Sequence, residues 1–412
     1  MSALTLRPSR TFCFKQLSGR DHPRYIVDVT SLPGASLPDR SLRSPPGWVA
    51  LPPLFDAHVH LDKTLFGSPW IPHRGLGTVA DRVLVEEQTL AAHPESVAVR
   101  ASRLLERLSA RGVSGIRSHV DVTDVTGLRN LEAVLALREE WSDRLSMDVV
   151  AFPQRGILRQ DSVIGLLRDA IARGADTVGG LDPTDFDGNL SGHLDVVFSL
   201  AAETGSRVDI HLHEPGATGT AALAAIAERT ADLGLAGRVV VSHAFCLADL
   251  EPAALAVTAD RLASAGVGIH TSLPRLGVIP PVPTLLAAGL NVAVVSDNIR
   301  DSWSPYGRGD PLERACLAGY LFGWTSDADL ERALLLVTSA PARSLGLVAA
   351  DPGREADDFE RDSSLDPGVD PLRNYVLVRA GSVGEAIVDQ PDARIVVRAG
   401  RVVAGQQYAE TL

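Results

Sequence analysis

Short runs of apolar and β-branched residues recur along the chain from about residue 50, and stretches with helical periodicity separate most of them. We interpret the runs as eight β-strands, at residues 49–57, 115–122, 147–152, 177–181, 207–211, 238–243, 266–271 and 291–297. Apolar residues recur at helical spacing in the segments 97–112, 131–141, 161–174 and 194–205. Several of these segments end in glycine, as helices often do.

This alternation of strands and helices predicts a parallel sheet. Eight such units in roughly 250 residues favour a closed (β/α)8 barrel, the α/β fold called a TIM barrel, over an open doubly wound sheet. We expect the barrel to span residues 49–346. No G-x-G-x-x-G follows an early strand and no G-x-x-x-x-G-K-[ST] occurs, so the nucleotide-binding folds lack their fingerprints.

The two ends of the chain do not follow the strand–helix spacing. The runs YVLVRAG and ARIVVRAGRVVAG near the C-terminus are typical of hairpin strands. We therefore expect residues 1–48 and 347–412 to pair in a small β-sandwich. Within it, the acidic segment 351–371 is rich in proline and glycine, which predicts a mobile surface loop.

Charge and cysteine content narrow the class of protein. Lys and Arg total 39 against 51 Asp and Glu, and the net charge of −12 repels nucleic acid and anionic lipid. No apolar leader and no stretch of about 18 apolar residues is present. The three cysteines, Cys13, Cys246 and Cys316, are too widely spaced for a thiolate metal site. We expect a cytoplasmic protein that acts on a small-molecule substrate and has no nucleic-acid or membrane partner. The composition is compatible with a homo-oligomer.

Candidate metal ligands gather where the predicted strands end. In FDAHVHLDK, residues 55–63, His58 and His60 are two residues apart and share one face of a strand. Later strands end in His119 and Asp121, in DIHLHE with His211, in VVVSHA with His243 and in VAVVSD with Asp297. The carboxyl ends of barrel strands form one rim, so these side chains converge if the barrel closes. Imidazoles and a carboxylate around an open position are typical of a catalytic metal ion that activates water.

Six ordered segments resemble the amidohydrolase superfamily, in its cytosine deaminase-like branch. They are HVHLDK, RSHVDVTD, VAFPQRGIL, IHLHE, VSHAFCLAD and SDNIRDSWSPYGRGD, spread over residues 48 to 346. Within that branch, VGGLDP and SDNIRDSW look closer to enzymes that hydrolyse N-isopropylammelide than to cytosine deaminase itself. The glutamine segment FPQRGIL and the glutamate of IHLHE are more similar to cytosine deaminase.

The resemblance implies one divalent metal ion, Zn²⁺ or Fe²⁺, bound by His58, His60, His211 and Asp297. It implies that Glu214 shuttles protons, that His243 hydrogen-bonds the attacking water or the developing oxyanion, and that Asp297 also accepts a proton. Some relatives hold two metals bridged by a modified lysine after strand four. That segment here, VGGLDPTDFDG, has no lysine, so we expect a mononuclear site.

The candidate substrate contacts are Lys63, Gln154, His213, Asn298 and Trp303. Lys63 is one of only two lysines beside 37 arginines, and it is either a surface residue or a cation aimed at the substrate. The resemblance nominates Gln154 as a reader of the ring edge, while Asn298 replaces an aspartate and weakens the case for cytosine. His213 is a substrate contact or a second-layer histidine, and Trp303 an aromatic wall or a packing residue.

These residues together predict a hydrolase of non-peptide C–N bonds that deaminates or dealkylaminates a planar nitrogen heterocycle, such as a pyrimidine or triazine, by metal-activated hydroxide. The alternative is an amidohydrolase that opens a cyclic amide or cleaves a linear one with the same groups. A barrel kept only as a scaffold would lack at least one ligand or the shuttle, and none is missing here.

Overall fold

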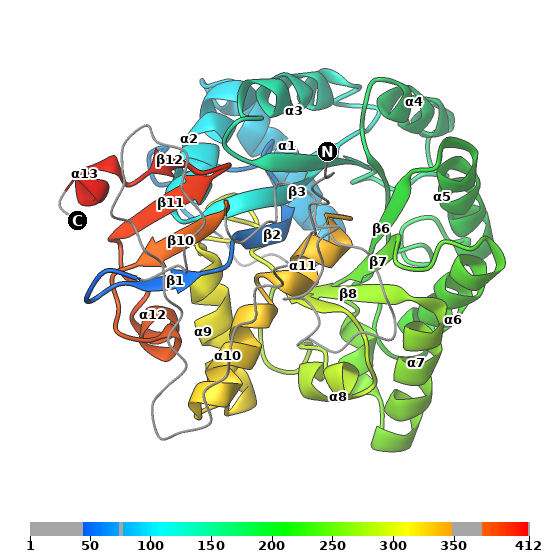
Figure 1. The fold of residues 1–412 in the computed structure, drawn as a ribbon. Helices are drawn as coiled ribbons and strands as arrows, with labels where there is room; N and C mark the ends of the chain where they lie inside the picture. Colours follow the sequence, from blue (N-terminus) through cyan, green and yellow to red (C-terminus); the bar gives the residue numbers. More distant parts are fainter. Residues whose placement is uncertain (1–43, 74–76, 348–372, 411–412) are drawn as a thin grey trace, which may run out of the picture.

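The computed structural model describes residues 44–73, 77–347 and 373–410 of the 412-residue chain. These residues form an eight-stranded parallel sheet in the order β2 to β9 and a four-stranded antiparallel sheet in the order β1-β10-β11-β12 (Figure 1). The parallel strands are β2 (Leu54–Val59), β3 (Val113–Asp121), β4 (Ser146–Phe152), β5 (Thr177–Leu181), β6 (Arg207–His211), β7 (Val239–Ser242), β8 (Val267–Thr271) and β9 (Val292–Val294).

The parallel sheet curls into a nearly closed barrel. After β9, Val59 and Asp297 form an isolated parallel bridge, and the Asp297 amide donates to the His58 carbonyl at 2.8 Å. This contact brings the last strand of the barrel back to the first. The predicted (β/α)8 barrel is thereby confirmed.

Helices cover the outside of the barrel because each buries one apolar face against the strands. In α2, Leu104, Leu105 and Leu108 are fully buried, and the Ser96 hydroxyl caps the first turn. The elements from β2 to β9 are joined by α1 (Val79–Ala92), α2 (Val97–Ala110), α3 (Arg129–Glu140), α4 (Asp161–Ala172), α5 (Leu190–Thr204), α6 (Gly216–Asp232), η1 (Phe245–Asp249), α7 (Pro252–Ala265) and α8 (Val282–Ala287). They are followed by α9 (Pro311–Phe322), α10 (Asp327–Leu335), α11 (Ser339–Ser344), α12 (Val383–Asp389) and α13 (Gln406–Ala409). No helix in the described ranges has the length and apolar character to cross a bilayer.

The first predicted strand, residues 49–57, is wrong as a single element. It divides into β1 (Val49–Leu51), in the antiparallel sheet, and β2, in the barrel. Pro52 and Pro53 separate the two, since proline cannot donate to a strand ladder. The sequence carried this signal in the letters LPPL.

The small sheet joins the two ends of the chain, as expected. Strand β1 pairs with β10 (Tyr375–Val378), which pairs with β11 (Arg394–Arg398) and, through it, β12 (Arg401–Ala404). Among the described residues it is one sheet. Residues 1–43 of the expected sandwich and the acidic segment 351–371 lie outside the described ranges.

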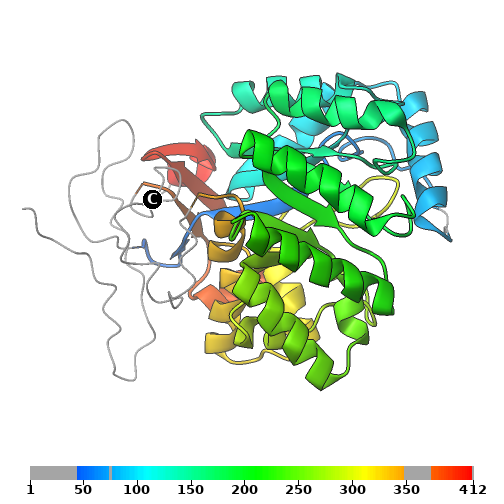
Figure 2. The same ribbon diagram turned by 90° about the vertical axis from the view of Figure 1, so that its right-hand side faces the viewer.

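The small sheet packs against the amino ends of the barrel strands. Arg398 of β11 donates to the Ser114 carbonyl near the start of β3, and Gly112 lies against Val376 of β10. Figure 2 shows the small sheet beside one end of the barrel. The carboxyl ends of the strands, where barrel sites form, are therefore on the other side.

Candidate active site

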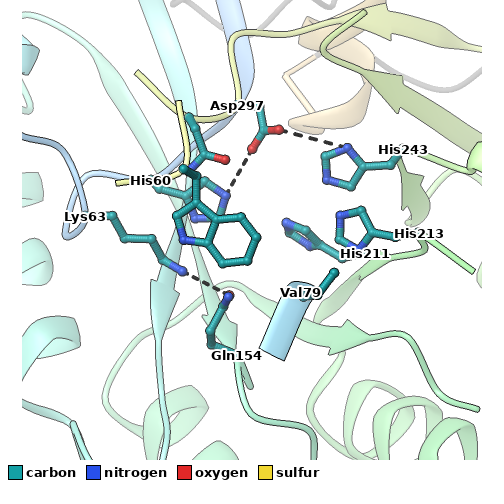
Figure 3. Close-up of a pocket in the computed structure, with 10 residues that line it drawn as sticks. His60, Lys63, Val79, Gln154, His211, His213, His243 and Asp297 are labelled. Carbon is teal, nitrogen blue, oxygen red and sulfur yellow. Dashed lines mark hydrogen bonds and ion pairs between the residues drawn. The ribbon is translucent and has the colours of Figure 1, made fainter. Parts of the chain in front are cut away.

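His58 lies in β2 and His60 directly follows this strand, beside Asp297, which follows β9. Figure 3 shows His60 next to Asp297. The Nε2 atoms of His58 and His60 are 3.3 Å apart, and Asp297 Oδ1 lies 3.4 Å from the first and 3.2 Å from the second. Ligands bonded at about 2.1 Å to one tetrahedral metal ion are about 3.4 Å from one another. The spacing of these three atoms therefore suits one shared metal ion.

His211 and His243, at the ends of β6 and β7, extend this cluster. The centroid of the His211 ring lies 4.6 Å from that of His58 and 4.9 Å from that of His243. Burial lowers the pKa of His60 to about 3 and holds the pKa values of His211 and His243 well below the usual range. The three rings are thus neutral at pH 7, and their lone pairs are available to a metal ion.

Unpaired buried nitrogens support the same conclusion. Both ring nitrogens of His211 and Nδ1 of His60 are buried without a hydrogen-bond partner. Such atoms are costly unless a metal ion or water occupies the space beside them. Three imidazoles and one carboxylate are a donor set that suits Zn²⁺ or Fe²⁺. The residues present therefore fit the metal ion that the sequence predicts.

A second group of possible ligands lies deeper in the barrel, where Asp209 meets His119 and His270. Asp209 Oδ2 accepts a hydrogen bond from Arg117 Nη1 at 3.0 Å. The guanidinium already balances the charge of this carboxylate, and it would repel a second cation nearby. The upper group, which contains His60 and Asp297, is therefore the better candidate for binding a metal ion.

The deeper group orients His58 instead. Nδ1 of His58 is 2.9 Å from Ser242 Oγ, which donates to Asp209 Oδ1 at 2.7 Å. Because the serine proton goes to the carboxylate, the ring of His58 donates from Nδ1 and keeps its lone pair at Nε2. This tautomer directs the lone pair toward His60 and Asp297.

His213 is held by Asp182, which follows β5. Asp182 accepts hydrogen bonds from the His213 backbone amide at 2.6 Å and from its Nδ1 at 2.8 Å. The His213 ring stacks on His243, with centroids 4.5 Å apart. Although burial opposes protonation, Asp182 raises the pKa of His213. His213 is thus fixed against His243 with its other ring edge toward the pocket.

The Glu214 side chain is buried next to His213 in the chain, and His213 lines the pocket. Its Oε1 accepts hydrogen bonds from the Thr184 and Asp185 amides at 2.6 and 2.8 Å. Its Oε2 is buried and has no partner among the described residues. Burial raises the pKa of this carboxyl group. The arrangement leaves one oxygen free to take and release a proton.

A pocket lies above the histidines, with about 310 Å³ of space between the atoms when its open mouth is included. Its walls come from the carboxyl ends of five barrel strands, β2, β4, β6, β7 and β9, and from helix α1. The lining residues are His60, Lys63, Val79, Gln154, His211, His213, His243, Asp297, Asn298 and Trp303.

Lys63 is buried among three polar partners. Nζ donates a hydrogen bond to Gln154 Oε1 at 2.9 Å and forms ion pairs with Asp121 Oδ1 at 3.0 Å and Glu86 Oε2 at 3.3 Å. Burial opposes its charge, but the two carboxylates raise the pKa of Lys63 above its usual value. The ammonium group is therefore directed at groups of the protein. The geometry favours a residue that orients Gln154.

Asn298 and Trp303 lie in the loop after Asp297. Asn298 Nδ2 donates to Asp301 Oδ2 at 2.6 Å, and Trp303 Nε1 donates to Glu86 Oε2. The indole ring is 6.0 Å from Lys63 Nζ. Trp303 therefore forms part of the pocket wall and is anchored at its polar edge.

Backbone strain marks the same rim. Asp182, His243 and Asp297 have φ values of 37°, 75° and 62°, in the left-handed region that residues other than glycine seldom adopt. Such conformations concentrate at functional sites, where the surrounding fold maintains them.

The sequence reasoning missed four residues that organise the site: Glu86, Asp182, Asp209 and Ser242. Asp209 could have been found, because it is two residues before His211 and shares its face of β6. Glu86 gave no signal, since it lies in the amphipathic helix α1 and meets Lys63 only through the fold.

Comparison with known proteins identifies the family. The model of the Amidohydrolase family matches residues 70–357, which is more than half of the chain. The chain therefore belongs to the amidohydrolase family, whose members are metal-dependent hydrolases of C–N bonds other than peptide bonds. The resemblance predicted from the sequence is confirmed.

Individual relatives place the chain within the family. Uncharacterized protein YahJ of Escherichia coli K12 is 36% identical over 71% of this chain and 64% of its own length, so the chain spans less than two thirds of that relative. A crystal structure of N-isopropylammelide isopropylaminohydrolase from Burkholderia multivorans is 38% identical, with a TM-score of 0.79 over 88% of this chain and 90% of the other. The structure of 5-methylcytosine deaminase from Klebsiella pneumoniae is 28% identical, with a TM-score of 0.73 over 92% and 91%.

Proposed function

We propose that this protein is a metal-dependent hydrolase that removes an amine from a planar nitrogen heterocycle. The observation that carries the proposal is the meeting of His58 Nε2, His60 Nε2 and Asp297 Oδ1 within 3.4 Å, below a pocket lined by two amides and an indole. Relatives named for N-isopropylammelide and for 5-methylcytosine support a ring as the substrate.

His58, His60, His211 and Asp297 would hold one divalent ion, Zn²⁺ or Fe²⁺. When bound, such an ion lowers the pKa of water toward about 7 and makes hydroxide available at neutral pH. The described ranges contain Lys63 as their single lysine, and its Nζ is bound to Asp121 and Glu86. No lysine there is free to bridge two metals, which supports a mononuclear site.

The chain's own residues would handle the protons. Asp297, whose pKa is held well below its usual value by the surrounding histidines in spite of burial, accepts the proton of the attacking water. Glu214 gives a proton from Oε2 to the ring nitrogen next to the attacked carbon. His243 donates a hydrogen bond to the oxygen that develops on that carbon. Asp297 then gives its proton to the amine nitrogen as the C–N bond breaks, and Glu214 takes back a proton from the new hydroxyl group as that group becomes a carbonyl. Ammonia or an alkylamine leaves, and the ring stays intact.

The test is product detection with metal-loaded protein and a panel of cytosine, isocytosine, creatinine and ammelide. Release of ammonia with an intact ring would support deamination. Ring opening without ammonia would favour the alternative, hydrolysis of a cyclic amide. Metal analysis should find about one ion per chain, and less in His60→Ala. Full metal content in that variant would contradict the ligand assignment.

A further inference from the structure

Two amide side chains line the pocket, and each is held by a buried charged group. One of these groups is a cation and the other is an anion. Lys63 binds the Gln154 carboxamide, and Asp301 binds the Asn298 carboxamide. An amide has a donor end and an acceptor end, so the group that binds one end decides which end remains for a ligand.

Gln154 is held by its acceptor end. Lys63 can only donate, so the atom 2.9 Å from its Nζ is the Gln154 oxygen. Lys63 is held in place, because it also forms ion pairs with Glu86 and Asp121 and all four side chains are buried. Gln154 Nε2 has no hydrogen bond among the described residues. Gln154 therefore offers N–H donors to the pocket.

Asn298 is held by its donor end. Asp301 Oδ2 accepts from Asn298 Nδ2 at 2.6 Å, while Oδ1 accepts the Trp303 and Ser304 amides at 2.8 and 3.0 Å. Asp301 is buried and fixed by these bonds. The oxygen of Asn298 has no hydrogen bond in the described part of the chain. Asn298 therefore offers an acceptor to the pocket.

We propose that Gln154 and Asn298 form a polarity filter, oriented by Lys63 and Asp301, that selects rings in the lactam form. Such a ring presents a carbonyl oxygen to Gln154 and a ring N–H to Asn298. A ring whose edge carries amino groups around an unprotonated nitrogen presents the opposite pattern and leaves both amides unpaired. This inference rests on the proposed function and specifies its substrate class.

Ammelide and melamine are matched probes for the filter. Away from the reacting amino group, ammelide presents a ring N–H between two carbonyl oxygens, and melamine presents a ring nitrogen between two amino groups. We expect the metal-loaded protein to bind ammelide at least about tenfold more tightly than melamine in calorimetry at pH 8, because each unpaired buried group is costly.

Two variants should reverse the filter independently. Gln154→Glu keeps the bond to Lys63 and replaces the free donor with an acceptor. Asp301→Asn keeps an oxygen for the Trp303 and Ser304 amides and places an N–H against Asn298, whose amide then turns its own donor toward the pocket. Each variant should lower the ratio of ammelide to melamine affinity by about tenfold or more. Circular dichroism and metal content verify that each is folded.

The exposed residues Gln160 and Asp143 supply matched controls, Gln160→Glu and Asp143→Asn, which should keep the wild-type ratio. The proposal is overturned if the wild type binds both rings equally or neither, or if both variants keep the wild-type ratio. Ammonia release is measured separately. If the variants change the ratio of ammelide to melamine affinity but no ammonia is released, the filter is supported and the proposed reaction is refuted. If ammonia is released from both rings and the variants keep the wild-type affinity ratio, only the filter is refuted.

Discussion

Glu214 holds a carboxylate where burial works against its charge, with one oxygen bound to two amides and the other free. Its replacement by the isosteric amide tests the assigned proton transfer. Glu214→Gln should lower kcat about a hundredfold or more, the usual size of a general acid–base contribution, and leave metal content unchanged. Glu228→Gln, an exposed change on α6, is the control and should retain full activity. Equal rates for the two variants would refute the role of Glu214.

The pH profile tests the same residue in another way. Burial raises the pKa of Glu214 above 4.5. Glu214 must carry its proton in order to give it to the ring nitrogen, so kcat/KM should fall as the pH rises through this raised pKa. We expect a limb that descends toward alkaline pH, with its midpoint above 4.5 in the wild type, measured between pH 4 and 8. A midpoint at or below 4.5 would show that the carboxyl group is not perturbed, or that another group limits the rate.

Ser242 tests how His58 is oriented. Ser242→Ala removes the acceptor of His58 Nδ1 and frees the ring to change tautomer. Loss of such a second-layer contact commonly weakens metal binding about 10- to 100-fold, which chelator competition would measure. Ser142→Ala, on the surface, is the matched control. Unchanged metal affinity in Ser242→Ala would mean that the hydrogen bonds from His58 through Ser242 to Asp209 do not orient the His58 ring.

At the scale of elements, a buried ion pair joins the small sheet to the barrel. Arg394 of β11 contacts Asp310, the N-cap of α9, through two bonds of 2.9 and 2.7 Å, and both side chains are buried. Asp310→Asn keeps a good N-cap but leaves the guanidinium without a counter-charge. The free energy of unfolding in urea should fall by about 3–5 kcal/mol.

The control for this ion pair is Glu203→Gln. Glu203 lies 3.9 Å from Arg168, and more than half of each side chain is exposed, so the change should be below about 1 kcal/mol. If Asp310→Asn costs no more than this control, the ion pair does not contribute to holding the two sheets together.

The elements themselves were largely predictable, and the exceptions have physical causes. All eight barrel strands were expected from apolar runs, because a parallel strand covered on both faces is apolar throughout. The division at Pro52 and Pro53 was readable but was missed. Helix α1 was not expected, although its Glu86 reaches Lys63. The amino-acid sequence of α1 does not by itself distinguish a helix that reaches the pocket from one that covers the outside of the barrel.

At the scale of the whole molecule, the sequence predicted only the part of the site that lies at the carboxyl ends of the barrel strands. His58, His60, His211, His243 and Asp297 do converge, because each ends or follows a parallel strand. The sequence could not reveal that Gln154, Asp121 and Glu86 surround the Lys63 ammonium group, or that the Thr184 and Asp185 amides hold one oxygen of Glu214. Those facts depend on side chains separated by up to 91 residues.

The same convergence leads us to expect that a bound metal ion stabilises the barrel. In the described residues, buried nitrogens of His60 and His211 have no hydrogen-bond partner, and the candidate ligand atoms come from separate strands. A ligand that binds only the folded state, at a concentration a hundred times its dissociation constant, adds about 2.7 kcal/mol of stability.

Removing the metal with a chelator should therefore lower the Tm by several degrees at a fixed scan rate, and Zn²⁺ or Fe²⁺ should restore it. In Asp297→Asn, which lacks the charged ligand, chelator and metal should shift the Tm much less. A wild-type Tm that chelation leaves unchanged, with loss of the ion verified by metal analysis, would show that the barrel closes around this rim without an ion.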